Sequence, residues 1–96
     1  MNARVEASVG GEIRTLKNEV EDPVKPLWSP GEHAHARVGM TVGTQYDFGR
    51  IKIAATVSYE CDQKQALIDE AGALAFYKAM EFMNEGLAIL QEEAGQ

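Results

Sequence analysis

The stretch "HAHARVGMTVGTQYDFGRIKIAATVSYE" (residues 33–60) contains two runs in which nearly every second residue is apolar. This alternation is the period of a β-strand that buries one face. Asp47 and Gly49 stand between the two runs and are typical of tight turns. The stretch therefore predicts a long antiparallel hairpin over residues 34–60, with one apolar face and one polar face.

The segment that follows the hairpin has the composition of one long helix. Helix-forming residues continue from 62 to 93, and Gly95 follows as a stop signal. Asp62 and Gln65 have the spacing of a capping box, which places the expected start of the helix at Asp62. The run Asn84-Glu85-Gly86 is a point where the helix could kink or break.

The N-terminal third is harder to assign. Residues 1–20 open with "ARVEASV", whose alternation predicts a short strand. Ile13, Leu16 and Val20 then recur at steps of three and four, which favours a short helix or turn. Residues 21–33 contain three prolines and are expected to form a loop. Trp28 in this loop is expected to anchor it on the core or on a neighbouring subunit.

These elements predict a single domain over residues 1–96 of the α+β class. Its small antiparallel sheet, the long hairpin plus a short N-terminal strand, would pack on the long C-terminal helix. The chain has one cysteine, Cys61, so no disulfide forms within it, and a lone thiol fits a reducing compartment. We find no signal-peptide pattern and no apolar run of roughly 20 residues. We therefore expect a cytoplasmic protein that does not enter a membrane.

The expected helix has more apolar surface than one small sheet can cover. A helix packed on a sheet needs an apolar stripe of about 100°, and here apolar residues occupy nearly half of the circumference. We therefore expect a homo-oligomer, a dimer or higher, because a lone chain would expose a large apolar patch. The residues expected at the subunit interface are Gly72, Ala75, Ala79, Phe82, Met83, Gly86 and Leu90. In the alternative interpretation, the small residues among them make room for the hairpin.

Charge is distributed unevenly along the chain. Residues 1–59 hold seven acidic and seven basic side chains, whereas residues 60–96 hold eight acidic side chains and two lysines, which gives the whole net charge of −6. An acidic half disfavours binding to duplex DNA. An acidic helix face also favours an alternative function, that of a protein-interaction inhibitor or DNA mimic. Its residues would be Glu70, Glu81, Glu85 and Glu92.

Basic residues alternate on the polar face of the expected hairpin and form the candidate ligand site. One interpretation is a solvated face whose cations pair with acids such as Glu32 and Glu60. The other is an anion site for phosphate or carboxylate, in which arginines act as fork donors and an aromatic ring stacks on the ligand. A third function, single-stranded nucleic-acid binding, would use the same face. The candidate ligand-binding residues are Arg37, Arg50, Lys52, His33, His35, Trp28 and Tyr46.

No set of residues points to catalysis, to a metal site or to a cofactor. Cys61 has no sequence partner that suggests a base or an oxyanion site, so we expect a buried structural thiol. His33 and His35 alone make an incomplete metal site. Gly39 and Gly43 lie in a strand and do not match a phosphate-binding loop. We therefore expect a non-enzymatic protein without metal or cofactor.

The segment "YDFGRIKIAATVSYECDQKQALIDEAGALAFYKAMEFM" (residues 46–83) resembles short accessory proteins of tailed phages that combine a β-hairpin with a long helix. The resemblance extends over about residues 36–90. Small phage proteins of this architecture include oligomeric anti-defence proteins, among them sponges that trap cyclic nucleotide signals of the Thoeris system at subunit interfaces. The resemblance implies sequestration in the host cytoplasm, with a small anionic ligand or a host protein as the partner.

Overall fold

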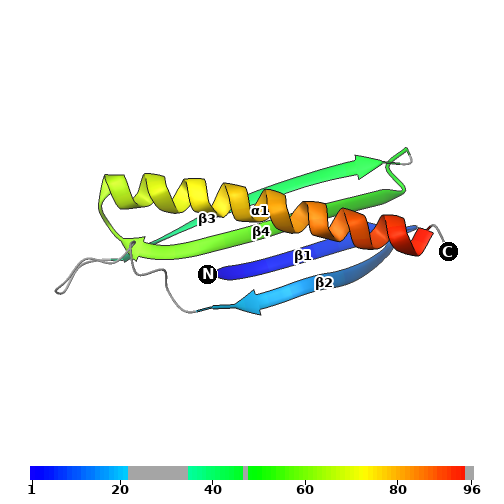
Figure 1. Ribbon diagram of the computed structural model, residues 1–96, viewed down its shortest axis with the longest axis horizontal. Coiled ribbons are helices and arrows are strands. Elements are labelled where there is room, and N and C mark those ends of the chain that lie inside the picture. Colours follow the sequence, from blue (N-terminus) through cyan, green and yellow to red (C-terminus); the bar gives the residue numbers. More distant parts are fainter. Residues whose placement is uncertain (22–34, 47, 95–96) are drawn as a thin grey trace.

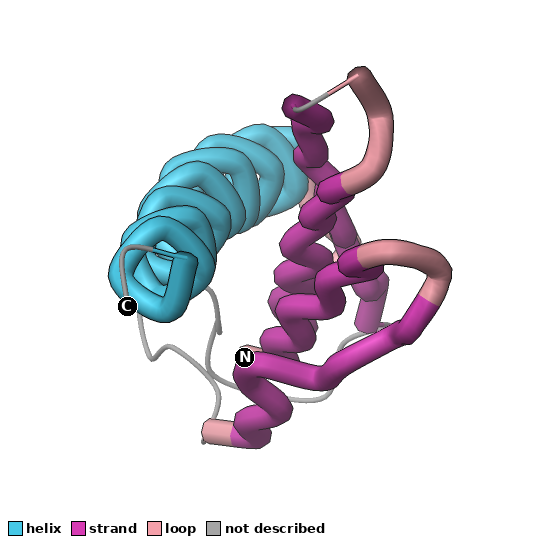
Figure 2. Tube along the Cα trace, turned by 90° about the vertical axis from the view of Figure 1, so that its right-hand side faces the viewer, coloured by secondary structure: helices cyan, strands magenta, loops and turns pink. Residues whose placement is uncertain are grey.

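The computed structural model describes residues 1–21, 35–46 and 48–94, with the backbone alone at Tyr46 and Ala94. Four strands form one antiparallel sheet in the order β2-β1-β4-β3, and one long helix lies across one face of it (Figures 1 and 2). The α+β prediction is thus confirmed. The elements are β1 (Asn2–Val9), β2 (Glu12–Val20), β3 (His35–Tyr46), β4 (Ile51–Asp62) and α1 (Gln65–Ala94).

The predicted hairpin is present as β3 and β4. Residues of the two strands pair when their numbers sum to 97, from His35 opposite Asp62 to Tyr46 opposite Ile51. Strand β1 lies on the other side of β4, where Val5 pairs with Ala55. The apolar face of β4 is buried as the alternation predicted, through Ile51, Ile53, Ala55, Val57 and Tyr59.

The prediction of a short helix or turn over residues 12–20 is wrong, because this segment is strand β2. Its pairing with β1 shifts between Val5 opposite Lys17 and Glu6 opposite Thr15, which leaves Leu16 as an extra, bulged residue. The bulge breaks the alternation of apolar residues, and this break produced the helix-like spacing. The sheet accordingly has two N-terminal strands where one was expected.

The helix begins later than the sequence predicted. Asp62 is the last residue of β4, and the Lys64 carbonyl accepts from the Ile68 amide at 2.9 Å, so the N-cap position belongs to Lys64 and not to Asp62. The Lys64 amide donates to the Asp62 carbonyl at 2.8 Å, and α1 starts at Gln65. The helix then continues without a break through residues 84–86 to Ala94.

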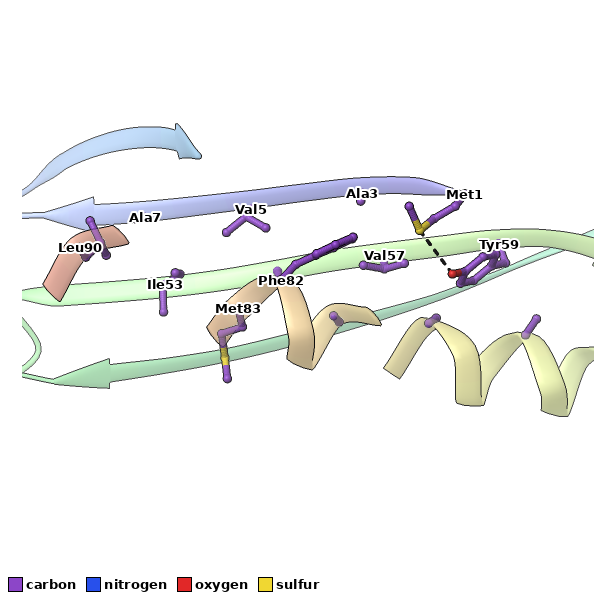
Figure 3. Close-up of a cluster of buried hydrophobic side chains, with 14 of the residues drawn as sticks. Met1, Ala3, Val5, Ala7, Ile53, Val57, Tyr59, Phe82, Met83 and Leu90 are labelled. Carbon is purple, nitrogen blue, oxygen red and sulfur yellow. Dashed lines mark hydrogen bonds between the residues drawn. The ribbon is translucent and has the colours of Figure 1, made fainter. Parts of the chain in front are cut away.

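Small side chains on α1 bring the helix close to the sheet. Ala71, Ala75 and Ala79 are fully buried, and a Cβ placed on Gly86 would lie 2.5 Å from Ile53 Cδ1. Larger side chains of the core fill the space on either side, with Phe82 and Leu90 from the helix against Val5 and Ile53 from the sheet (Figure 3). The core therefore lies between one sheet face and one helix face.

This packing corrects the interface prediction. The seven helix residues expected between subunits are all buried within their own chain. Side chains buried in this way offer no surface to a second copy. Among them, Ala75, Ala79 and Gly86 make room for the strands, as in the alternative interpretation. The seven residues are Gly72, Ala75, Ala79, Phe82, Met83, Gly86 and Leu90.

Within the described residues, no helix has the length and apolarity that are needed to cross a bilayer.

Candidate ligand-binding site

Arg37 lies near the start of β3, on the sheet face that α1 does not cover. Its cross-strand partner is Glu60, and its Nη2 lies 3.9 Å from Glu60 Oε2. Its Nη1 donates a hydrogen bond to Ser58 Oγ at 3.3 Å. The Arg37 side chain is 55% exposed. Because both contacts are long for charge-assisted bonds, the guanidinium can still donate to a ligand.

Asn2, at the start of β1, is a third neighbour of the Arg37 guanidinium, after Ser58 and Glu60. With its amide oxygen toward Arg37, Asn2 accepts from Nη1 at 2.6 Å, and its amide nitrogen donates to the Met1 carbonyl at 3.3 Å. The Asn2 amide therefore holds the guanidinium over the end of β1. Two strands far apart in sequence thus fix the position of one basic side chain.

A cavity of about 270 Å³ opens beside Arg37. The Met1 amino group donates to the Glu21 carbonyl at 3.0 Å, and the Glu21 amide donates to the Met1 carbonyl at 2.7 Å, which holds the end of β2 against the start of β1. The cavity presents cationic donors, an amide and carboxylates to the same space. The residues that line it are Met1, Asn2, Val20, Glu21, Arg37 and Glu60.

His35, the first residue of β3, lies two residues before Arg37 on the same face and contacts two acids. Its Nδ1 is 3.5 Å from Glu60 Oε1, and its Nε2 is 3.6 Å from Asp62 Oδ1. The imidazole of His35 therefore lies between the half-exposed carboxylate of Glu60 and the buried carboxylate of Asp62. The cross-strand pairing of basic residues with Glu60 is thus present, as one interpretation of the polar face expected. The other acid named for it, Glu32, lies outside the described residues.

The prediction of a single basic patch is wrong. Lys52 lies on the same face as Arg37 but pairs with Gln45, near the turn of the hairpin. Eight residues of β4 separate Lys52 from Glu60, about 26 Å at roughly 3.3 Å per residue. Arg50 is also at that far end, where its carbonyl accepts from the Gly10 amide at 3.1 Å. An antiparallel hairpin sets the start of one strand against the end of the other, so these cations cannot meet.

Three candidate residues cannot be assigned a place in this site. Trp28 and His33 lie outside the described residues, and of Tyr46 the structure describes the backbone alone. Their roles in binding stay predictions. The described part of the uncovered sheet face carries no aromatic side chain, so it offers no stacking surface to single-stranded nucleic acid.

Cys61 is fully buried in β4 beneath the helix. Burial raises the pKa of its thiol, and the neighbouring Asp62 charge adds to the rise. A thiol of this kind is protonated and poorly nucleophilic, as a structural cysteine is. The described residues also contain no group of three or more His, Cys, Asp or Glu side chains that could hold a metal ion.

The acidic face of the helix is partly compensated by lysines. Glu81 lies 3.2 Å from Lys78 Nζ, and Glu85 lies 3.2 Å from Lys17 Nζ. Two of the four acids proposed for a DNA mimic are therefore engaged within the chain. This arrangement weakens the case for an inhibitor that acts through the acidic face.

Sequence reasoning missed Asn2 and Ser58 as neighbours of Arg37. Ser58 could have been predicted, because counting outward from the connection between the two hairpin strands places Arg37 opposite Glu60 and one alternate position from Ser58. The contact with Asn2 could not have been predicted, since nothing in the alternation of β1 shows which strand β1 pairs with.

Comparison of the chain with protein-family models, with curated proteins and with solved structures finds no match.

Proposed function

We propose that this chain is a non-enzymatic binding protein that holds a small phosphate-bearing ligand in the cavity at Arg37. The observation that carries the proposal is the half-exposed guanidinium at the wall of a cavity, held by Asn2 at Nη1 and with only long contacts to Ser58 and Glu60. A guanidinium presents five donors in a planar fork that matches the oxygens of phosphate. The residues beside it come from β1, β3 and β4, so the sheet holds the donor in place.

The walls of the cavity favour a nucleotide over a bare anion. Glu60 and Glu21 both line the cavity, and their carboxylates would repel inorganic phosphate. The N–H groups of a nucleotide base can donate hydrogen bonds to those carboxylates, and the phosphate oxygens can accept hydrogen bonds from Arg37. The resemblance to phage sponges adds that the ligand is a cyclic nucleotide signal and that binding removes it from the cytoplasm of the host.

The proposal is tested by calorimetric titration of the protein with cyclic mononucleotides, cyclic dinucleotides and inorganic phosphate. We expect at least one nucleotide to bind more tightly than phosphate. Arg37→Ala should weaken that binding about 10- to 100-fold, since hydrogen bonds to charged groups contribute about 1.5–3 kcal/mol.

The matched control is Lys52→Ala, which removes one positive charge from the same sheet face about 26 Å away. We expect the control to bind the nucleotide as the wild type does. Absence of heat with every nucleotide would contradict the proposal, and so would equal weakening by both substitutions.

A further inference from the structure

The two edges of the sheet differ in how they are protected. Strand β2 carries Glu12, Arg14, Lys17 and Glu19, and a bulge interrupts its pairing with β1. Charges and bulges are the features by which natural sheets prevent further strands from adding to an edge. Residues 38–46 of β3 carry no charged side chain, and the described pairing of β3 with β4 has no register shift. Within the described residues, the β3 edge is therefore regular and long, and neither charges over residues 38–46 nor a bulge protect it.

Exposed apolar side chains flank this edge on the helix side. Met40 of β3 is 39% exposed, and Phe76 of α1 is 43% exposed. Gly72 lies against Val38, since a Cβ on Gly72 would be 3.7 Å from Val38 Cγ1. Helix and β3 run in the same direction (Figure 1). From Gly72 to Phe76 the helix advances about 6 Å, and from Val38 to Met40 the strand advances about 6.6 Å. Since Gly72 lies beside Val38, Phe76 lies at the level of Met40.

We infer that the β3 edge is a docking surface for a second copy of this chain. The two β3 strands would pair antiparallel and join two four-stranded sheets into one of eight strands. Met40 and Phe76 of each copy would then be covered by the other. This surface is separate from the seven buried helix residues, and the inference does not depend on the ligand proposed for the Arg37 cavity.

The charges of β3 favour its own antiparallel copy as the occupant. Arg37 lies at one end of the strand, and pairing centred on Thr41 would set it opposite Gln45 of the second copy. The two arginines would then lie far apart, at opposite ends of the interface. Like charges directly opposite each other destabilise strand pairs, and a parallel arrangement would bring the two arginines together.

The size of the edge also fits a stable dimer. The molecule measures 53 × 21 × 18 Å, and β3 spans 12 residues. A strand of this length extends about 40 Å, and the molecule is 18–21 Å across, so the edge with its helix flank presents roughly 800 Å². This is about the area per partner of a standard specific interface.

Sedimentation velocity over a range of concentrations tests the inference. The wild type is expected to reach a dimer of twice 10.5 kDa. Met40→Lys places a charge at the edge and should shift the particle to a monomer, with at least a tenfold weaker association. The matched control Ile13→Lys makes the same kind of change at the other edge strand, where Ile13 is 76% exposed, and should leave the dimer intact.

Circular dichroism of each variant verifies that the fold is retained, and hydrogen exchange gives a second measurement. In the wild-type dimer, β3 amides on both sides of the strand should exchange slowly, and in Met40→Lys alternate amides should exchange faster. A 10.5 kDa wild-type particle at all concentrations would overturn the inference. A dimer that survives Met40→Lys, or one that Ile13→Lys dissociates, would overturn it as well.

Discussion

Gly72 and Gly86 both lie on the buried side of α1, yet their surroundings differ. A Cβ on Gly72 would meet Val38 at 3.7 Å, an ordinary contact distance. A Cβ on Gly86 would lie 2.5 Å from Ile53 Cδ1 and 3.2 Å from both Leu16 Cδ1 and Val5 Cγ1. The helix therefore needs a glycine at 86 for its close approach to the sheet, whereas the glycine at 72 has no such steric role.

The two glycines give a matched pair of stability predictions. Gly72→Ala should raise the free energy of unfolding by up to about 1 kcal/mol, because alanine is the better helix former. Gly86→Ala gains the same propensity but overpacks the core, which costs about 1–3 kcal/mol. Urea unfolding should therefore find Gly86→Ala less stable than Gly72→Ala. Equal stability of the two variants would show that the helix does not approach the sheet so closely at 86.

At the scale of elements, β2 shows why part of the fold could not be read from the sequence. Its apolar residues Ile13, Leu16 and Val20 have helical spacing, but they do not share a face. Ile13 and Val20 are 76% and 80% exposed, and the bulge at Leu16 turns that residue toward Gly86 of the helix. An alternation rule fails at a bulge because the extra residue reverses the phase of the side chains.

Lys17 makes two of the contacts that attach strand β2 to α1. Its Nζ lies 3.8 Å from the centre of the Phe82 ring and 3.2 Å from Glu85 Oε2. Lys17→Ala should lower the free energy of unfolding by about 1 kcal/mol, the sum of a cation–π contact and a surface ion pair. Urea unfolding measures the loss.

The control for this prediction is Arg4→Ala, which breaks the ion pair of Arg4 with Glu6 within β1, where no helix is involved. We expect its stability to stay close to that of the wild type. If both substitutions had the same small effect, Lys17 would not attach β2 to the helix.

A second contact between β2 and α1 is sensitive to pH. Arg14 donates to Glu93 through Nη2 at 3.0 Å and through Nη1. This hydrogen bond, aided by the charge of Arg14, lowers the pKa of the Glu93 carboxyl. A lowered folded-state pKa means that the contact stabilises the fold above the unfolded-state pKa and is lost as pH falls through the folded-state value.

Carboxyl titration by NMR should therefore give Glu93 a lower midpoint in the wild type than in Arg14→Ala. Since both side chains are exposed, the effect on stability should be small. Identical midpoints in the two proteins would contradict the contact.

At the scale of the whole molecule, the sequence predicted the elements better than the positions of charges across the sheet. The hairpin and the helix follow from local periodicity, which repeats over many residues. The site depends on register and strand order, which are not local. Arg37 and Lys52 share a face by alternation, but the antiparallel register places Glu60 beside Arg37 and Gln45 beside Lys52. The addition of β1 to the far side of β4, which brings Asn2 to Arg37, has no signal in the pattern.

The most direct test of the proposed site is a two-dimensional NMR titration of the wild-type protein with the nucleotide that gives the largest calorimetric heat. The amide shifts of Asn2, Arg37 and Glu60 are expected to move together and saturably, while those around Lys52 stay in place. Shifts confined to the Lys52 end of the sheet, or no saturable shift at any amide, would contradict a ligand site at Arg37.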